Sequence, residues 1–391
     1  MDAIYWIWLQ DALGYASNIG QVILEHDLSP QWLYEADRDT LDELGLLTPE
    51  QITNLKLTGL DHARRVWEDC QRKQYRVVPL DDPDYPERLR NIYQPPLVLY
   101  CEGQLPPLDR LPSVALVGTR KLSAYGCRVS SQFSQGLCRA GVVVVSGLAV
   151  GVDTEAHKGC VRAGGPTIAV LGCGLDRNYP AQNSDLRRVI PQYGGAIVTE
   201  YQPDVPPIPR NFPLRNRIIS GLSLGVVVVE ASRRSGSLIT AKWAEEQNRD
   251  VFAVPTDIYD PNGAGVLALI KQGAKPATCV EDILEEYSSL FGDKMTITPP
   301  EAAVEAPARK KRTRPKADAG FPAEAAPSPE TVPDLSPEEM QLFRVLEHEP
   351  QTADQLVEKS GLSPAKALSI LTTLELIGAA RSHPGLRFSR P

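Results

Sequence analysis

The chain has 391 residues, of which 42% are hydrophobic, and a formal net charge of −8 at pH 7. This length predicts roughly two to four domains with sizeable cores, and the acidic balance excludes a protein that coats nucleic acid with a basic surface. A local basic groove remains compatible with this balance, because exposed charges are screened beyond roughly 8–10 Å.

The cysteines and the apolar segments set further bounds. The seven cysteines are scattered and form no CxxC pair, which argues against a zinc site and against a secreted disulfide framework. The first ten residues are apolar but carry no basic n-region, so they predict a core helix and not a signal peptide. No apolar run is long enough to cross a membrane. We therefore expect a cytoplasmic protein without a metal site or membrane contact.

Residues 1–73 are predicted to form a helical domain, of the SAM or helix-hairpin-helix type. Two helical segments, 41–47 and 55–60, contain glycines typical of helix C-caps. Such units sometimes hold a DNA backbone through the amides of their turns. A packing or protein-contact module is an equally good interpretation, because acidic residues outnumber basic ones between positions 25 and 50.

Residues 74–290 are predicted to form an α/β domain with an extended lead-in over 76–112. From residue 113, continuous apolar runs alternate with helical stretches, as expected for strands buried on both faces of a parallel sheet. The runs cover 114–117, 142–145, 167–171, 196–198, 226–229 and 251–254. This alternation predicts a Rossmann-like, doubly wound, mostly parallel sheet, with a ligand crevice beyond the carboxyl ends of its strands.

A short helix over 211–220, leading into a buried strand, concentrates cationic side chains on a packed element. Its apolar stripe consists of Leu214, Ile218 and Leu222, spaced four residues apart. Arg215 and Arg217 flank this stripe. Such an arrangement suits the recognition of an anion.

Glycine-rich turns follow the first three strands of the predicted sheet. The first strand runs into Gly118-Thr119-Arg120, the second into Ser146-Gly147, and the third into a further pair of glycines. Glycines let backbone amides approach an anion, and a helix N-terminus adds a favourable dipole. Together with the arginines, the turns predict a site for several phosphates. The dinucleotide fingerprint and the Walker lysine motif are absent, so we expect no nucleotide cofactor.

Carboxylates also stand at strand ends, where an enzyme would place them. Asp153 opens a predicted helix, so capping explains it. His157 could pair with Asp153 or bind a metal, but the motif lacks other ligands at suitable spacing. Glu230 could hold Arg215 or Arg217 in a salt bridge. No Ser/His/Asp or Cys/His set is present, so we expect no catalytic residues.

The C-terminal part divides into a linker and a small domain. Residues 291–334 are rich in Pro, Ala and Glu and are predicted to be a disordered linker. Residues 335–391 read as helix, turn, helix and hairpin, which is a winged-helix pattern. The second of these helices carries Lys366 as its one cation, which is little for reading a major groove. Contact with DNA and contact with protein both remain open.

Several ordered motifs resemble the DNA-processing protein A family, also called Smf. They cover residues 117–120, 146–153, 167–180 and 212–223, followed by Glu230, 235–237 and 251–255. The resemblance extends over about residues 75–285. It implies a protein that binds single-stranded DNA without an established catalytic step. Members receive and protect incoming strands in natural transformation, help to load the RecA recombinase, and commonly dimerise through the Rossmann-like domain.

The resemblance and the strand-end turns together give a set of expected site residues. The expected DNA contacts are Gly118, Thr119, Arg120, Ser146, Gly147, Arg210, Phe212, Asn216 and Arg217. The Phe212 ring offers a surface for a stacked base, although an apolar plug at the helix start would explain it as well. Asp153, Arg215 and Glu230 are expected to be structural, with Arg215 as a partner of Glu230.

Two other functions remain as alternatives. A related Rossmann class has phosphoribohydrolase activity on nucleotides, but the chain has residues 234–237 where that class has Pro-Gly-Gly-x-Gly-Thr. A regulator that binds DNA through its winged helix is the second alternative. The chain also departs from the family pattern over 260–270, which leaves the details of a dimer edge open.

Overall fold

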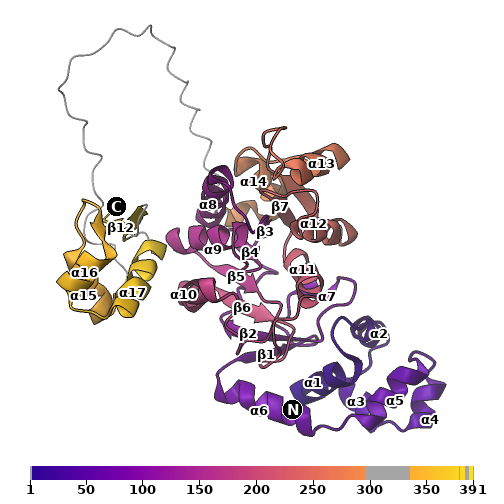
Figure 1. Cartoon of the computed structure of the whole chain (residues 1–391). Helices are drawn as coiled ribbons and strands as arrows, with labels where there is room; N and C mark the ends of the chain where they lie inside the picture. Colours follow the sequence, from indigo (N-terminus) through magenta and orange to yellow (C-terminus); the bar gives the residue numbers. More distant parts are fainter. Residues whose placement is uncertain (1, 296–334, 378, 384–386, 391) are drawn as a thin grey trace, which may run out of the picture. The chain divides into compact units, whose positions relative to one another are not determined.

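The computed structural model describes residues 2–295, 335–377, 379–383 and 387–390 (Figure 1). The chain divides into two compact units, Met1–Thr296 and Ile297–Pro391. The predicted linker falls outside the described residues from 296 onward. Residues 291–295, which the prediction included in it, are part of the first unit: Met295 is buried and belongs to its core.

Six short helices precede the sheet. They are α1 (Asp2–Leu13), α2 (Ile19–Glu25), α3 (Pro30–Glu35), α4 (Arg38–Glu43), α5 (Pro49–Leu57) and α6 (Asp61–Arg72). Side-chain oxygens of Ser29, Asp37 and Thr48 accept hydrogen bonds from backbone amides in the first turns of α3, α4 and α5. Such caps satisfy amides that have no partner within the helix, so these residues determine where the helices begin.

A nine-stranded sheet forms the centre of the first unit. Its strands are β1 (Arg76–Pro79), β2 (Val98–Gly103), β3 (Ser113–Val117), β4 (Val143–Ser146), β5 (Thr167–Val170), β6 (Ala196–Thr199), β7 (Gly225–Val228), β8 (Asp250–Ala253) and β9 (Lys275–Pro276). They lie in the order β1-β2-β6-β5-β4-β3-β7-β8-β9. The pairings from β6 through to β9 are parallel, whereas β1 and β2 add an antiparallel edge. The predicted mostly parallel α/β sheet is confirmed.

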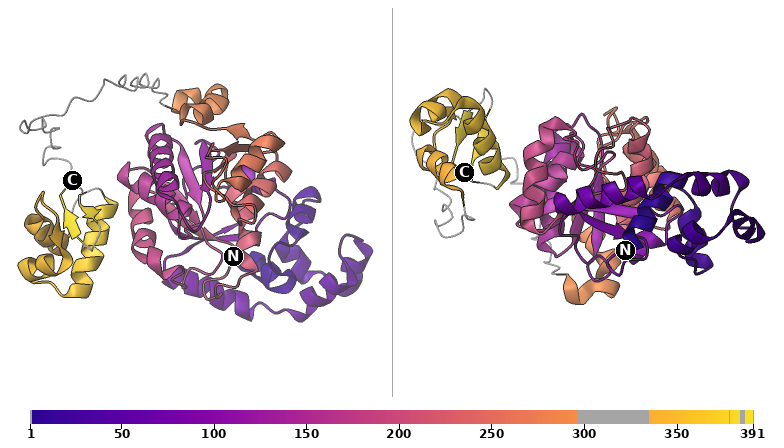
Figure 2. Two further views of the ribbon diagram at one scale, coloured as in Figure 1. Left: turned by 45° about the horizontal axis from the view of Figure 1, so that its top comes forward. Right: turned by 90° about the horizontal axis from the view of Figure 1, so that it is seen from below.

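Helices cover both faces of the sheet (Figure 2). They are α7 (Glu87–Arg90), α8 (Ala124–Arg139), α9 (Val152–Arg162), α10 (Ser184–Val189), α11 (Asn211–Gly221), α12 (Ser237–Glu246), α13 (Ala264–Gln272) and α14 (Glu281–Phe291). The core between the sheet and helices α8, α9 and α14 contains Val114, Val144 and Val227. Helices α11 and α12 pack on each other, and α12 also packs on β7 and β8.

The strand order fixes where a ligand crevice lies. From β3 the chain moves through β4 and β5 to β6 on one side, then crosses back to β7 on the other side of β3. In doubly wound sheets, ligands bind beyond the carboxyl ends of the strands at such a switch point. The strand order therefore predicts a ligand site beyond the carboxyl ends of β3 and β7.

The N-terminal helices pack directly against the antiparallel edge of the sheet. In α1, the buried Gln10 donates from Nε2 to the carbonyl oxygen of Glu200 at 3.0 Å. Its Oε1 accepts from the hydroxyl of Tyr100 on β2 at 3.1 Å. Because both groups are buried, these bonds fix α1 relative to the sheet.

The described residues of the second unit form three helices and a small sheet. They are α15 (Pro337–Val345), α16 (Ala353–Ser360), α17 (Pro364–Leu376), β10 (Gln351–Thr352), β11 (Arg381–His383) and β12 (Arg387–Ser389). The strands lie in the order β10-β12-β11, and the predicted winged-helix fold is confirmed. On α17, Lys366 forms an ion pair with Glu338. Across the described residues of both units, no helix has the length and apolar content to span a bilayer.

Candidate functional site

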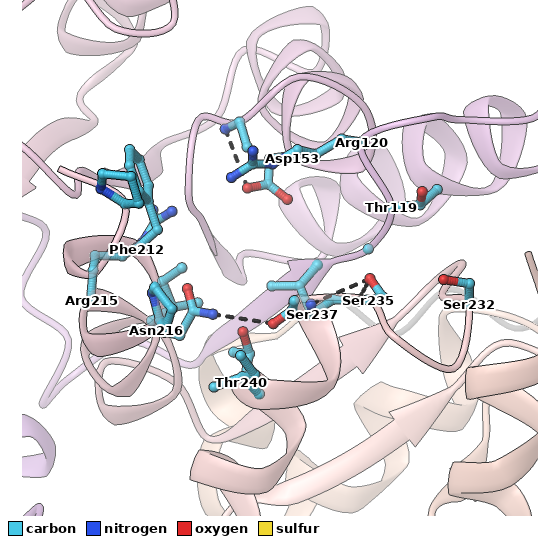
Figure 3. A pocket seen from close by; sticks show the side chains of 18 of the residues that line it. Thr119, Arg120, Asp153, Phe212, Arg215, Asn216, Ser232, Ser235, Ser237 and Thr240 are labelled. Carbon is cyan, nitrogen blue, oxygen red and sulfur yellow. Dashed lines mark hydrogen bonds between the residues drawn. The ribbon is translucent and has the colours of Figure 1, made fainter. Parts of the chain in front are cut away.

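A cavity of about 540 Å³ lies at the switch point between β3 and β7. Its walls come from the turn after β3, the turn after β4, helix α11 and the segment that begins α12. The lining includes Gly118, Thr119, Arg120, Asp153, Phe212, Arg215, Asn216, Ser232, Ser235, Gly236, Ser237 and Thr240. Figure 3 shows the labelled side chains from these segments arranged around the cavity.

The turn after β3 is held tightly by its neighbours. The amide of Thr119 donates to the carbonyl oxygen of Glu230 at 2.7 Å, and its carbonyl oxygen accepts from Val152 at 3.2 Å. A Cβ at Gly118 would lie 2.4 Å from Val152 Cγ2, so the close approach requires glycine here. Arg120 is exposed and donates no hydrogen bond within the described residues. Its guanidinium is available to an anion.

Asp153 organises the turn after β4. Its Oδ2 accepts hydrogen bonds from the amides of Gly147 at 3.1 Å and Ala149 at 3.3 Å. The prediction that Asp153 caps its own helix is wrong, because Asp153 is the second residue of α9 and binds amides that precede the helix. Burial raises the pKa of this carboxyl group, and the positive charge of Arg215 opposes the rise.

Arg215 reaches the cavity although the predicted role placed it elsewhere. It is 4% exposed, and its Nη1 donates to the carbonyl oxygens of Val170 and, at 2.9 Å, of Gly147. Burial lowers the pKa of the guanidinium, and Asp153 opposes this. The predicted Arg215–Glu230 pair is not formed, since the buried Glu230 instead accepts from the amide of Ser123 at 3.1 Å.

Arg217 lies in the interior of the unit. It has no exposed surface, and its Nη2 forms a 2.6 Å ion pair with Oε2 of Glu200, which is 1% exposed. Two residues along a helix turn the side chain by about 200°, so Arg215 and Arg217 point to opposite sides of α11. The predicted DNA contact by Arg217 is therefore wrong. The predicted DNA contact by Ser146 is also wrong, because this residue is buried and its hydroxyl donates to the carbonyl oxygen of Leu116.

The N-terminus of α12 forms the opposite wall of the cavity. Asn216 of α11 donates from Nδ2 to the carbonyl oxygen of Gly236 at 3.3 Å, which ties the two helices together. The hydroxyls of Ser235 and Ser237 lie 2.8 Å apart. The first amides of α12 are bonded within this turn: that of Ser237 donates to the Ser235 hydroxyl at 3.4 Å, and those of Leu238 and Ile239 donate to backbone carbonyl oxygens at 3.2 Å. The serine hydroxyls are therefore the groups that this wall offers to an anion. These serines are not among the predicted site residues, because their position depends on β7 lying next to β3.

Phe212 lies at the edge of the cavity, beside an aromatic residue that is not among the predicted contacts. The ring of Tyr179 is 5.4 Å from that of Phe212, between centroids. Arg210 is exposed and lies in an adjacent hollow between α11 and α12, lined also by Lys242 and Trp243. The predicted contacts thus divide: Gly118, Thr119, Arg120, Phe212 and Asn216 share one cavity, Gly147 borders a small crevice beside it, and Arg210 lies outside.

The histidine considered as a metal ligand is part of the core. His157 is fully buried, and its Nδ1 lies 2.8 Å from the hydroxyl of Thr167. Burial lowers the pKa of His157 to about 3, and the charge of Arg215 adds to this effect. The described residues contain no group of three His, Cys, Asp or Glu side chains placed to hold a metal ion.

Comparison with known proteins agrees with the geometry. A family model described as DNA recombination-mediator protein A matches residues 76–288, and one described as DprA winged helix domain matches residues 325–385. The chain is 37% identical to Protein Smf from Synechocystis over 336 residues, which are 83% of this chain and 82% of that protein.

Two solved structures are similar as well. DNA processing protein A from Streptococcus pneumoniae is 35% identical with a TM-score of 0.62, covering 73% of this chain and 98% of that one. The protein of that name from Helicobacter pylori, described for its single-stranded DNA binding mode, is 29% identical with a TM-score of 0.50, covering 55% and 96%. The chain belongs to the DNA recombination-mediator protein A family.

Proposed function

We propose that this protein binds single-stranded DNA in the cavity between β3 and β7 and acts as a recombination mediator. The observation that carries the proposal is the convergence of three kinds of group on one cavity: the guanidinium of Arg120, that of Arg215, and the serine hydroxyls at the start of α12. Guanidinium and hydroxyl groups recognise phosphates without regard to base sequence. The single-stranded DNA binding mode described for the Helicobacter pylori relative supports the same ligand.

The cavity suits a single strand because an aromatic ring stands next to the phosphate-binding groups. Phe212 borders the same cavity as Arg120, whose guanidinium lies 5.8 Å from the centre of its ring. Proteins that bind single strands combine a cationic groove with aromatic surfaces for unstacked bases. We expect binding that tolerates changes of sequence and weakens as salt rises.

The substitution Arg120→Ala tests this proposal directly. Loss of one charged phosphate contact should weaken binding of an oligothymidylate about ten- to a hundredfold. The slope of log K against log salt should fall by about 0.7. Fluorescence anisotropy over a salt series measures both quantities. Arg64→Ala, which removes an exposed arginine from α6, is the matched control. Equal affinities for wild type and Arg120→Ala would show that the cavity is not the DNA site.

The wider role follows from the family. We propose that the protein receives and protects incoming single strands in natural transformation and helps to load RecA on them, acting in the cytoplasm as a homodimer formed through the Rossmann-like domain. The description of the family as recombination mediators supports the RecA step. Stimulation of RecA filament assembly by wild type, reduced in Arg120→Ala, is the expected result. Sedimentation equilibrium measures the oligomeric state.

We further propose that the site binds DNA without a chemical step. The strand-end glutamate that a phosphoribohydrolase would use, Glu230, is 1% exposed and accepts a hydrogen bond from the backbone at the start of α8. Its role is to position Ser123 and the turn beside it. Release of free base from nucleoside monophosphates by the purified protein, abolished in Glu230→Gln, would contradict this.

A further inference from the structure

Tyr179 is an exposed aromatic residue at the mouth of the cavity. It lies in the loop that follows β5, is 38% exposed, and lines the cavity together with Phe212. Its hydroxyl has no hydrogen-bond partner among the described residues, although that of the similarly exposed Tyr125 donates to Pro255. The Tyr179 hydroxyl therefore does not hold the side chain in place.

The Phe212 ring is less available than its position suggests. A Cβ on Gly172 would lie 2.9 Å from Phe212 Cδ1, so the ring packs directly on the glycine backbone. The guanidinium of Arg120 and the tilted ring of Tyr179 cover further parts of it. The crevice behind the ring, lined by Gly147 and Pro180, has a volume of about 40 Å³. This holds a few waters and is too small for a nucleobase.

We infer that Tyr179 is the surface on which a nucleobase stacks, and that Phe212 supports it from below. The inference rests on the proposed function, since it specifies how the same site holds a single strand. The two rings meet at an interplanar angle of 49°, so contact with Phe212 fixes the orientation of the Tyr179 ring while its outer face stays in solvent. A base stacked on the outer face of Tyr179 extends the aromatic cluster of Tyr179 and Phe212. Arg120 lies beside Phe212, where its guanidinium can bind the phosphate next to that base.

The loop that carries Tyr179 is held before any ligand arrives. The amide of Tyr179 donates to the carbonyl oxygen of Arg177 at 3.1 Å. That carbonyl oxygen also accepts from Nη1 of Arg187 at 2.8 Å, and the Arg177 side chain donates to the carbonyl oxygen of Asp204. Because a fixed ring loses little conformational freedom on binding, stacking on it contributes more to affinity than stacking on a mobile ring.

The test compares the full-length wild type with Tyr179→Leu on two ligands: an oligothymidylate, and a chain of abasic deoxyribose phosphates of equal length. Stacking on an aromatic side chain typically changes affinity by about tenfold or more. Tyr179→Leu should therefore weaken binding of the oligothymidylate about tenfold and leave binding of the abasic chain unchanged. Tyr179→Phe, which keeps the ring, should bind both ligands like wild type.

Control variants separate this inference from the proposed function. Arg120→Ala should weaken binding of both ligands by a similar factor, because its contact is with phosphate. Tyr259→Leu removes a tyrosine that is 87% exposed on a loop outside the cavity, and should bind both ligands like wild type. If Arg120→Ala weakens binding while Tyr179→Leu binds the oligothymidylate like wild type, the stacking role is wrong. If neither substitution weakens binding, the proposed function itself is wrong.

Discussion

Asp153 and His157 lie one turn apart on α9, and both are buried. The cost of burying the Asp153 carboxylate is offset by hydrogen bonds from two backbone amides and by the charge of Arg215. His157 is fully buried beside the hydroxyl of Thr167, and its pKa of about 3 means that the folded protein keeps this imidazole neutral. Burial disfavours the charged form unless an opposite charge is close.

His157 should make the free energy of unfolding sensitive to acid. The unfolded chain binds a proton at this side chain below about pH 6.5, whereas the folded chain does so only near pH 3. Its contribution to stability is thus complete above pH 6.5 and is lost as the pH falls toward 3. The loss amounts to about 1.4 kcal/mol per pH unit, or roughly 2–3 kcal/mol by pH 4.5.

Urea unfolding of wild type and His157→Asn at pH 7.0 and 4.5 measures this contribution. The variant is expected to be less stable at pH 7.0 and to lose less stability on acidification than wild type. His26→Asn, at an exposed histidine, should follow the wild type. An unchanged pH dependence in His157→Asn would show that the buried imidazole is not the group that resists protonation.

The residues of the site differ in how far the sequence could identify them. Arg120 and Phe212 stand in motifs that point to them directly. The predicted positions of Arg215 and Arg217 are the reverse of those in the structure. The sequence shows their spacing on a helix but not the rotation of that helix about its axis. Only the pairing of Arg217 with Glu200 inside the fold settles which arginine faces the cavity. The sequence does not single out Tyr179, because an aromatic residue in a loop indicates a binding site only when its neighbours in space are known.

Helix α11 connects the site to the rest of the unit. Its first turn carries Phe212, its second carries Arg215 and Asn216, and its inner side carries Arg217. The ion pair between Arg217 and Glu200 joins the middle of α11 to the end of β6. A pair of buried charges tolerates replacement of both partners far better than removal of one.

The substitution Arg217→Met should therefore destabilise the protein by about 3–5 kcal/mol, because it leaves the Glu200 carboxylate buried without a counter-charge. The double variant Arg217→Met/Glu200→Leu should recover most of this loss. Urea denaturation of the two single variants and the double variant gives the coupling energy. The double variant should bind an oligothymidylate like wild type. A stable double variant with weak binding would mean that Arg217 contacts DNA after all.

The elements themselves were largely predictable. The six buried strands were found within a few residues, because strands covered on both faces read as continuous apolar runs. The short β9 was not predicted, since two residues carry no periodic signal. The position of α12 at the cavity could not be predicted from the sequence either, because it depends on the order of strands in the sheet. Chain order alone does not show that β7 pairs with β3.

The proposed DNA site and the winged helix belong to different units of the whole molecule. All residues that line the cavity lie in Met1–Thr296, which has its own core. In the winged-helix unit, Lys359 of α16 and Lys366 of α17 both form ion pairs with glutamates, so these two lysines offer little charge to a duplex. The two units can therefore be tested for separate contributions.

A protein shortened to residues 1–295 should bind an oligothymidylate within about threefold of the full-length affinity, since every proposed phosphate contact remains. Fluorescence anisotropy of both proteins at the same salt concentration measures this. The shortened protein carrying Arg120→Ala is the matched negative control. A loss of most of the affinity on shortening, with the fold intact by circular dichroism, would favour a DNA-binding role for the winged helix.

Glu200 serves two elements at once. Its carboxylate holds α11 through Arg217, and its carbonyl oxygen holds α1 through Gln10. A substitution that shifts α1 should therefore also move α11, the helix that carries Phe212. Random mutagenesis followed by screening for lost recombination should thus recover substitutions around Gln10, which is far in sequence from the residues that line the cavity. Compensating changes at Tyr100, which bonds the same amide group, should appear among their suppressors.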